Sequence, residues 1–470
     1  MAVSPDSRAR LRRIAGSIVL PLCAPGGAFG AGELLPPSKT APVEVVEWIG
    51  TQAMPLSTVS LSGDVADLAP LREIVGSARL VGFGEGMHNT HELWSLRNRL
   101  FAWLVQELGF TAIALETGFL DGMAADDYVQ GEPVDPHQAA HGVFSWASGV
   151  FAENLELIDW MRRYNAGRAP QDRVRLYGLE ILSCGEFDGR WLVEPALDFL
   201  TAHGPASASE LRRRFLLLLP KFNEKGHAGA SPEERRALLE AVEDLVIEYE
   251  RSQSRLIASA TRRAYERAYH LAIVSRQMLA YLRMGGKGRD IADAQNLRWV
   301  LEREGPRARV FVFAHDGHLA KRASLVDRRG AAPTPMGELL HGSLVEPMVV
   351  IGSLFYRGTG RELFGLYGPV NGTFDVLPSR PDSLNGAFAA AGLQLFLLDL
   401  RKVPTAGSVH QWFAQPQGIR DVAGYDLIDV RASFDALLFV ERVSPQRLLA
   451  PSVPGKCRDG GRLSLQRATR

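Results

Sequence analysis

The chain contains very few cysteines. Only three occur among its 470 residues, namely Cys23, Cys184 and Cys457. Three widely separated cysteines are too few for a framework of disulfide bonds or for a zinc site built from thiolates, even in an oxidising compartment. Stability therefore has to come from a hydrophobic core. The composition allows one, because 46% of the residues are hydrophobic and 23% are charged, as is ordinary for a globular protein.

An excess of charge of one sign is also missing. The 53 Lys and Arg residues balance the 53 Asp and Glu residues, so the formal net charge is zero. Because no general field or basic run attracts nucleic acid, we expect no nucleic-acid partner. No segment beyond residue 30 has the roughly twenty uninterrupted apolar residues of a membrane span, so we expect none in the mature protein.

The first thirty residues differ from the rest of the chain. Four arginines between positions 8 and 13 precede an apolar run at 14–22, and small residues then lead to Gly30. This order is typical of a signal peptide, and we predict one at 1–30. An amphipathic surface helix or a start codon assigned too early would be the alternative. We therefore expect an exported protein, either periplasmic or secreted.

Strand and helix patterns alternate along most of the remaining chain. Short apolar runs predict strands at 79–83, 111–115, 174–180, 309–314, 347–354, 393–398 and 436–440. Apolar residues at helical spacing predict helices at 43–50, 68–75, 91–108, 122–129, 154–164, 289–303 and 383–391. The alternation predicts an α/β fold with a mostly parallel central sheet flanked by helices.

One long stretch interrupts this alternation. From 187 to 285 there is no strand pattern, while leucines at helical spacing and many charges run through it, with a break near 226–231. We predict a helical insertion at 187–285, between core parts at 31–186 and 286–452, with a flexible tail at 453–470. The insertion is either a solvated packing layer or a wall that shapes access to the sheet, and we favour the wall.

A glycine-rich loop follows the first predicted core strand. Its sequence at 82–88 is Gly-Phe-Gly-Glu-Gly-Met-His, and a long helix is expected from about His91. The glycines let the backbone turn sharply and leave space beside it. Glu85 and His88 supply a carboxylate and an imidazole at the carboxyl end of a strand, which is where open α/β sheets bind their ligands. The loop is therefore a candidate site.

Three further predicted strands end in ionisable residues. Glu116 follows the second strand, Glu180 ends the third, and His315 and His318 follow the fourth. The carboxyl ends of parallel strands meet at one edge of a sheet, so these residues are expected to converge although they are distant in sequence. Two histidines three residues apart are equally consistent with a metal site and with a catalytic pair, and their spacing does not separate the two.

Arg97 lies on the apolar stripe of the helix expected at 91–108, together with Leu93, Leu100 and Leu104. A buried arginine needs an anionic partner, because burying the unpaired charge is costly. Alternatively, the side chain reaches solvent along its aliphatic stem. Periodicity alone leaves both possibilities open.

Several motifs together resemble the erythromycin esterase family. They are Gly84-Glu85-Gly86-Met87-His88 with Glu92 and Arg97, Leu115-Glu116, Trp160-Met161-Arg162-Arg163-Tyr164-Asn165, Tyr177-Gly178, Arg289-Asp290 with Asn296 and Trp299, and Ala314-His315-Asp316-Gly317-His318. The match extends from about 81 to 352, and its specificity lies in the shared order of the motifs. The resemblance implies an α/β core with an inserted helical region and hydrolysis of an ester or macrolactone.

The resemblance also implies roles for the site residues. His88 would act as general base on a water molecule that attacks the carbonyl, and Glu85 or Glu116 would orient an imidazole. Stabilisation of the oxyanion or protonation of the leaving alcohol would fall to Arg97, Arg289 and one of His315 and His318. The chain has no Gly-x-Ser-x-Gly motif to supply a serine nucleophile, which suits direct attack by water.

The sequence departs from the family pattern around the site. Larger residues than usual occur at Met87 and Asn89, Glu180 replaces a more usual Asp, Asp316 replaces the common Asn, and Asp293 replaces an apolar residue. Glu180 and Asp316 make the site more acidic. We expect these two side chains to bind the substrate and to influence which substrate, or which cation, is bound.

Two other classes of protein stay open. Carboxylates and imidazoles are typical ligands of zinc and manganese, so the same residues would suit a metal-dependent hydrolase. A non-catalytic exported binding protein would use the same cleft to hold a polar ligand. The leading prediction is a hydrolase that acts on a small-molecule ester or lactone without an obligatory metal.

Overall fold

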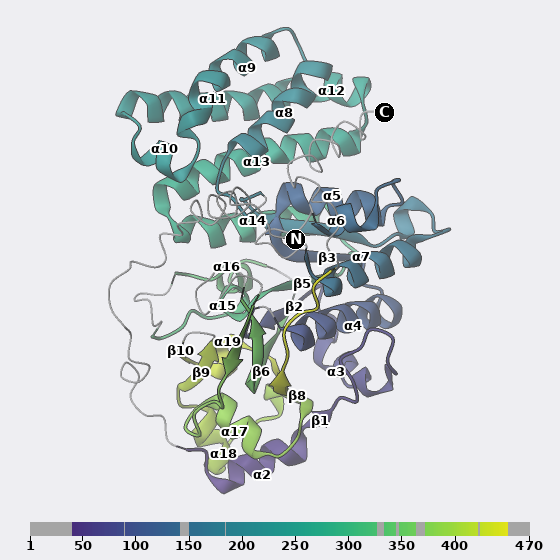
Figure 1. Ribbon diagram of the computed structural model, residues 1–470, viewed down its shortest axis with the longest axis vertical. Helices are drawn as coiled ribbons and strands as arrows, with labels where there is room; N and C mark the ends of the chain where they lie inside the picture. The colour runs from purple at the N-terminus through teal and green to yellow at the C-terminus, as the bar shows by residue number, and fades with distance from the viewer. Residues whose placement is uncertain are drawn as a thin grey trace, which may run out of the picture.

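The computed structural model describes residues 40–88, 90–141, 150–183, 185–326, 333–344, 347–362, 372–421 and 424–449 (Figure 1). The predicted signal peptide at 1–30 and the predicted tail at 453–470 lie outside these residues, as does Asn89.

A nine-stranded sheet forms the centre of the described chain, with the order β1-β8-β11-β6-β2-β5-β3-β4 and with β7 paired to β6. Its strands are β1 Met54–Pro55, β2 Leu80–Glu85, β3 Ala112–Gly118, β4 Arg175–Glu180, β5 Val310–His315, β6 Met348–Arg361, β7 Thr373–Val376, β8 Leu395–Asp399 and β11 Ala436–Val443. All neighbours from β11 to β4 are parallel, and the pairings of β1, β7 and β8 are antiparallel. The predicted α/β fold with a mostly parallel sheet is confirmed.

The central strands are mostly apolar up to their carboxyl ends, because both faces of the sheet are covered. In β5, Phe311 and Phe313 enter one hydrophobic cluster while Val310 and Val312 enter another, as the two-residue period of a strand requires. The helices that contribute to the first cluster include α3 Leu71–Val75, α4 His91–Leu108 and α7 Ala152–Asn165. Those of the second include α2 Val43–Gln52, α14 Gly286–Glu304, α16 Met336–His341, α17 Leu384–Ala390 and α18 Gly407–Phe413.

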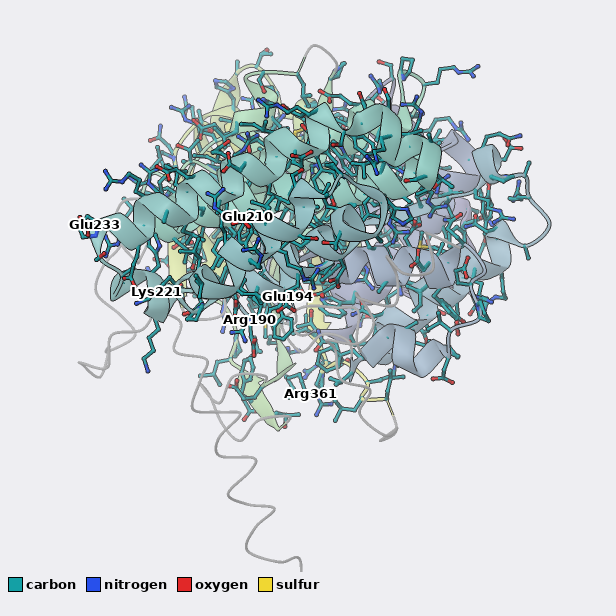
Figure 2. The ribbon with its side chains drawn as sticks, turned by 90° about the horizontal axis from the view of Figure 1, so that it is seen from above. Arg190, Glu194, Glu210, Lys221, Glu233 and Arg361 are labelled. Carbon is teal, nitrogen blue, oxygen red and sulfur yellow. The ribbon has the colours of Figure 1, made fainter. Side chains whose placement is uncertain are left out.

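A group of consecutive helices follows β4 and lies above the sheet in Figure 1. They are α8 Arg190–His203, α9 Ser207–Leu218, α10 Glu224–Ala228, α11 Pro232–Arg251, α12 Gln253–Ser259 and α13 Arg262–Met284. Their cluster also takes in Phe119 and Leu120 from α5 Phe119–Val129. Figure 2 looks onto these helices and shows charged side chains, among them Glu210 and Glu233, on their outer side. The division of the chain at 187 and 285 stays a prediction.

Local sequence explains where several of these elements begin. The break expected near 226–231 is found at 229–231, between α10 and α11, where Ser231 caps α11 in a reciprocal capping box with Glu234. The single helix expected at 68–75 is wrong in detail, because Pro70 separates a 3-10 turn, Ala66–Leu68, from α3. Proline has no backbone N–H and is suited to the position just before a helix.

Short and partly exposed elements were not predicted. They include α16, α18, β7 and the separate antiparallel pair β9 Gln417–Asp421 and β10 Gly424–Ile428. β6 continues to Arg361, well beyond the predicted strand end at 354, and its last four residues pair with β7. In the described part of the chain, every helix is too short or too polar to span a bilayer.

Candidate active site

Four neighbouring strands bring ionisable residues to one edge of the sheet. Glu85 ends β2 and pairs in register with His315, which ends β5. Glu116 in β3 accepts a hydrogen bond of 2.7 Å from the backbone N–H of His315, across 199 positions of sequence. Glu180 ends β4 and pairs with Gly118 in β3. The parallel order β2-β5-β3-β4 therefore collects these residues as expected for an α/β sheet.

His88 lies in the loop after β2 and is bonded to Glu85. Its Nδ1 is 2.6 Å from Glu85 Oε2, and because an ionised carboxylate only accepts hydrogen bonds, Nδ1 carries a proton. Glu85 is itself held by the indole N–H of Trp94, which donates to Oε1. Burial would lower the pKa of His88, but Glu85 outweighs this effect and raises it to about 9. The His88 side chain is 45% exposed, and Nε2 is the ring nitrogen that is not bonded to Glu85.

His315 lies beside His88, with 4.7 Å between the ring centroids. Its Nδ1 accepts a 3.1 Å hydrogen bond from the backbone N–H of Gly317, so in the neutral ring the proton belongs to Nε2. Burial lowers the pKa of His315 to about 3, and the carboxylate of Asp421, 3.8 Å from Nε2, does not reverse this. His315 therefore supplies a neutral N–H donor next to His88.

His318, in the short helix α15 Asp316–Leu319, interacts with two acids. Its Nδ1 is 2.8 Å from Asp290 Oδ1, and its Nε2 is 3.6 Å from Glu116 Oε1. Burial acts to lower the pKa of His318, but Asp290 outweighs it and the net shift is upward. His318 and Arg289 in turn hold the pKa of Glu116 below its usual value, although burial acts in the opposite direction.

Arg289, in α14, links the ends of β3 and β4. One terminal nitrogen is 2.7 Å from Glu116 Oε1, and Nε is 3.1 Å and 3.0 Å from the two carboxylate oxygens of Glu180. Glu180 is fully buried. A planar guanidinium has enough donors to serve both acids at once. This ion pair network fixes the side of the site away from His88.

Arg97 does not reach the sheet edge. It is 2% exposed, and its guanidinium lies 5.1 Å from the ring centroids of Trp94 and Phe313. In the part of the chain that is described, no carboxylate forms an ion pair with it, so neither expectation for Arg97 is met. Its Nε donates to Asn98 Oδ1 instead. Cation–π contacts replace the expected anion, and Arg97 acts on Glu85 only through Trp94 and the electric field.

The two residues expected to contact substrate are both buried. Asp316 is 6% exposed and accepts hydrogen bonds of 3.3 Å and 3.2 Å from the backbone N–H of Ser353. Glu180 is enclosed by Arg289. Glu180 is the last residue of β4 and Asp316 directly follows β5, and the helices packed at these strand ends leave both side chains buried. In this structure each would influence a substrate only through its neighbours.

The glycines of the loop are required for close approach. A Cβ on Gly84 would lie 1.7 Å from Asp316 Oδ1, and one on Gly86 would lie 2.2 Å from the carbonyl oxygen of Ser353. Neither glycine has the positive φ that would require glycine for conformational reasons. The loop therefore needs glycine for space, which is the second of the two reasons expected from the sequence.

Sequence reasoning missed several side chains of the site. Asp290 was noticed only as the neighbour of Arg289, and its contact with His318 depends on how α14 docks. Trp94 follows the loop on α4, where no local pattern marks it as a site residue. Asp421 is at the end of β9, and no local pattern connects it with His315. Their positions follow from tertiary packing.

The same residues are the candidates for a metal site. Over the described ranges, no group of three or more His, Cys, Asp or Glu side chains has an arrangement that could hold a metal ion. Nδ1 of His88 and Nδ1 of His318 are each bonded to a carboxylate.

The fold and the site together define an α/β protein whose sheet edge combines histidines, carboxylates and a guanidinium. The family model for erythromycin esterase matches residues 105–443. The chain therefore belongs to the erythromycin esterase family, which confirms the resemblance seen in the sequence and makes the protein a hydrolase.

Individual relatives agree with this assignment. The chain is 22% identical over 421 residues to erythromycin esterase type II of Escherichia coli, covering 85% of this chain and 97% of the relative. It is similar to a solved structure of a Bacillus cereus protein, with a TM-score of 0.74, 24% identity, and coverage of 87% and 99% of the two chains. A histidine-to-asparagine mutant of the erythromycin esterase EreC, in its open conformation, gives a TM-score of 0.63 at 18% identity, with coverage of 83% and 96%. The likeness to the solved structures shows a shared fold.

Proposed function

We propose that this protein hydrolyses an ester or macrolactone by means of a water molecule that His88 activates as general base. The observation that carries the proposal is the 2.6 Å contact between His88 Nδ1 and Glu85 Oε2 in a side chain that is 45% exposed. This contact orients the ring so that Nε2 faces the open side, where it can accept a proton from water. Similarity to erythromycin esterases supports the type of bond cleaved.

The proton path in this reaction is short. Neutral His88 takes a proton from water as the oxygen attacks the carbonyl carbon, and a tetrahedral oxyanion forms. When this intermediate collapses, protonated His88 returns the proton to the leaving alcohol oxygen, and the products are an acid and an alcohol. Glu85 stabilises the imidazolium that exists between these two steps, because a carboxylate at 2.6 Å favours the charged ring.

His315 is the side chain best suited to the developing oxyanion. Its proton is on Nε2, since Nδ1 accepts from Gly317, and its ring is adjacent to that of His88. A neutral donor does not compete with His88 for the proton, and one preorganised donor to an oxyanion is worth about 2.7–4 kcal/mol in a hydrolase. His318 and Arg289, which bind Asp290, Glu116 and Glu180, are assigned to positioning the acids.

The substrate, location and cofactor requirement belong to the same proposal. We expect a small-molecule ester or lactone as substrate and action after export, in the periplasm or outside the cell. The proton path described above needs no obligatory metal.

A hydrolysis screen tests the proposal. Full-length protein is incubated with macrolides, simple esters and lactones, before and after dialysis against EDTA. We expect turnover of at least one ester or lactone, unchanged by EDTA. His88→Ala should reduce turnover by about 100-fold or more, because general base catalysis typically contributes 10² to 10⁴.

The matched control is His341→Ala, because His341 is an exposed histidine at the end of α16. It should retain wild-type turnover. Equal turnover by His88→Ala and wild type, or no turnover of any compound, would overturn the proposal. Loss with EDTA that zinc or manganese restores would favour the metal-dependent alternative.

A further inference from the structure

One buried carboxyl group at the site has no part in this scheme. Asp293 lies in α14 and is 3% exposed. Its Oδ1 has no hydrogen-bond partner within the described ranges. An ionised carboxylate in such surroundings is strongly unfavourable, so the group must either pair with a cation or retain its proton.

The geometry of α14 directs this carboxyl towards Glu180. Arg289, Asp293 and Asn296 are spaced four and then three residues apart, so they share one face of the helix. The two outer members contact the end of β4. Arg289 Nε is 3.0 Å from Glu180 Oε2, and Asn296 Nδ2 donates at 2.6 Å to the carbonyl oxygen of Leu179. Asp293, between them on the same face, therefore faces the end of β4 and the carboxyl of Glu180.

Carboxyl groups outnumber cations around this face. Glu116 and Glu180 both pair with Arg289, and Asp293 is the third carboxyl near the same guanidinium. Burial, followed by repulsion from Glu180, raises the pKa of Asp293 well above its usual value. Burial likewise raises the pKa of Glu180, although Arg289 opposes it. One positive charge does not neutralise these three carboxylates, of which Glu180 and Asp293 are buried, so a proton is required.

The remaining charged groups nearby do not change this balance. His318 of α15 is bonded to Asp290 of α14, so these two charges are matched with each other. Tyr281 of α13 donates its hydroxyl proton to Glu224, and burial raises its pKa above the usual value of a tyrosine, so it stays neutral.

We propose that Glu180 and Asp293 hold a single proton between them at neutral pH, and that this proton makes Asp293 a positioning residue for Arg289. With the proton, the pair carries one negative charge and Arg289 stays shared between Glu180 and Glu116. When the pair loses this proton, its second negative charge draws the guanidinium of Arg289 away from Glu116. Glu116 is the residue that accepts a hydrogen bond from the backbone N–H of His315. The charge of the Glu180–Asp293 pair thereby affects His315, whose ring lies beside that of His88. This last consequence rests on the proposed hydrolytic function.

Infrared difference spectroscopy of the full-length protein at neutral pH tests the shared proton without any substrate. Wild type should show a band of a buried protonated carboxyl that is lost in Asp293→Asn, because Glu180 is then fully ionised against Arg289. The band should also be lost in Glu180→Gln, because Asp293 then ionises against Arg289. Any other protonated carboxyl is present in both proteins and cancels in the difference spectra.

Asp198→Asn is the matched control. Asp198 pairs with Arg212 and its side chain is 37% exposed, so this variant should keep the band and the wild-type turnover. Retention of the band in Asp293→Asn would overturn the proposal. Retention in Glu180→Gln alone would also overturn it, because Asp293 would then be protonated independently of Glu180. Circular dichroism spectra confirm that each variant is folded.

Steady-state kinetics test the role of Asp293 in positioning Arg289. In wild type, kcat/KM should fall at alkaline pH as the pair loses its proton, and in Asp293→Asn this fall should move to higher pH or disappear. An unchanged alkaline fall would refute the positioning role. If no substrate is cleaved, the infrared result still decides the shared proton. If the infrared band is absent while His88→Ala abolishes turnover, the proposed function stands and this inference fails.

Discussion

At the scale of single residues, the site gives two adjacent imidazoles opposite protonation states. The carboxylate of Glu85 raises the pKa of His88 to about 9 against the effect of burial, whereas burial lowers that of His315 to about 3. The backbone N–H of Gly317 fixes which nitrogen of His315 holds the proton. Because their surroundings separate the two pKa values, one site can supply both a base, His88, and a neutral hydrogen-bond donor, His315.

The pH dependence of hydrolysis should report the state of His88. Only the neutral ring accepts a proton, so wild-type kcat/KM should rise about tenfold per pH unit below a midpoint near pH 9. Glu85→Gln removes the carboxylate charge that raises the pKa of His88, and should move the midpoint towards the usual value of about 6.5. Steady-state rates on a substrate without ionisable groups measure both midpoints. The same midpoint in both proteins would show that Glu85 does not control the base.

At the scale of elements, β2 has glycine at two alternate positions, Gly82 and Gly84, on the face that meets α15. A Cβ on Gly82 would lie 3.3 Å from the side chain of Leu319, and one on Gly84 would overlap Asp316. Val81 and Phe83, at the alternate positions, fill the hydrophobic cluster on the opposite face. The glycine spacing therefore lets a short helix lie directly against a strand, and this contact sets where Asp316 and His318 are held.

Gly84→Ala should destabilise the protein through this contact. The added Cβ would lie 1.7 Å from Asp316 Oδ1 and 3.1 Å from Asp316 Cα, so backbone as well as side chain has to move. Overpacking of this kind typically costs about 1–3 kcal/mol in free energy of unfolding. Urea denaturation measures the loss. Gly286→Ala is the control, because a Cβ there meets nothing within 4 Å, and its effect should stay within about 0.5 kcal/mol. Equal stability of the two variants would contradict the expected clash.

At the scale of the whole molecule, the segment after β11 returns to the first half of the chain. The backbone N–H of Ser444 donates to Glu92 at 2.7 Å, and Leu449 donates to the carbonyl of Val150 at 2.8 Å. Between them, Arg447 binds Glu153, which is fully buried and also contacts His91. The late segment thus fastens α7 and α4, and α4 is the helix that follows the loop carrying His88.

Glu153→Gln should weaken this attachment. The variant loses charge-assisted hydrogen bonds from His91 and Arg447, each worth about 1.5–3 kcal/mol in typical cases, so we expect a loss of at least about 1 kcal/mol at neutral pH. Although burial opposes it, hydrogen bonds from His91 and Arg447 lower the pKa of Glu153. A carboxyl group whose pKa is lower in the folded than in the unfolded protein stabilises the fold at pH values above its unfolded-state pKa. This stabilisation is lost as the pH falls through the folded-state pKa. The difference from wild type should therefore narrow in acid.

Urea titrations at neutral and acid pH measure this change. Glu156→Gln is the control, because Glu156 binds the same Arg447 but its side chain is 41% exposed. An exposed ion pair contributes about 0–1 kcal/mol, so the control should change little. A difference between wild type and Glu153→Gln that is constant with pH would show that the charge of Glu153 is not responsible.

Much of the fold could be predicted because its main elements are long and strongly patterned. The central strands are mostly apolar up to their carboxyl ends, and α4 and α14 are long helices, so their local signals agree with their tertiary surroundings. The short helix α16 and the pair β9 and β10 could not be predicted, because short, partly exposed elements have weak periodicity and depend on neighbours for stability.

For the site, the sequence by itself determined which strand ends carry acids and histidines, since a carboxylate or imidazole directly after an apolar run is a local feature. The parallel order of β2, β5, β3 and β4 then makes Glu85, Glu116 and His315 neighbours. Only the tertiary structure decided that Arg97 lies against Trp94 and that Asp290 binds His318. Those contacts depend on the angle and register at which helices dock on the sheet, and no spacing within one segment encodes a contact between two.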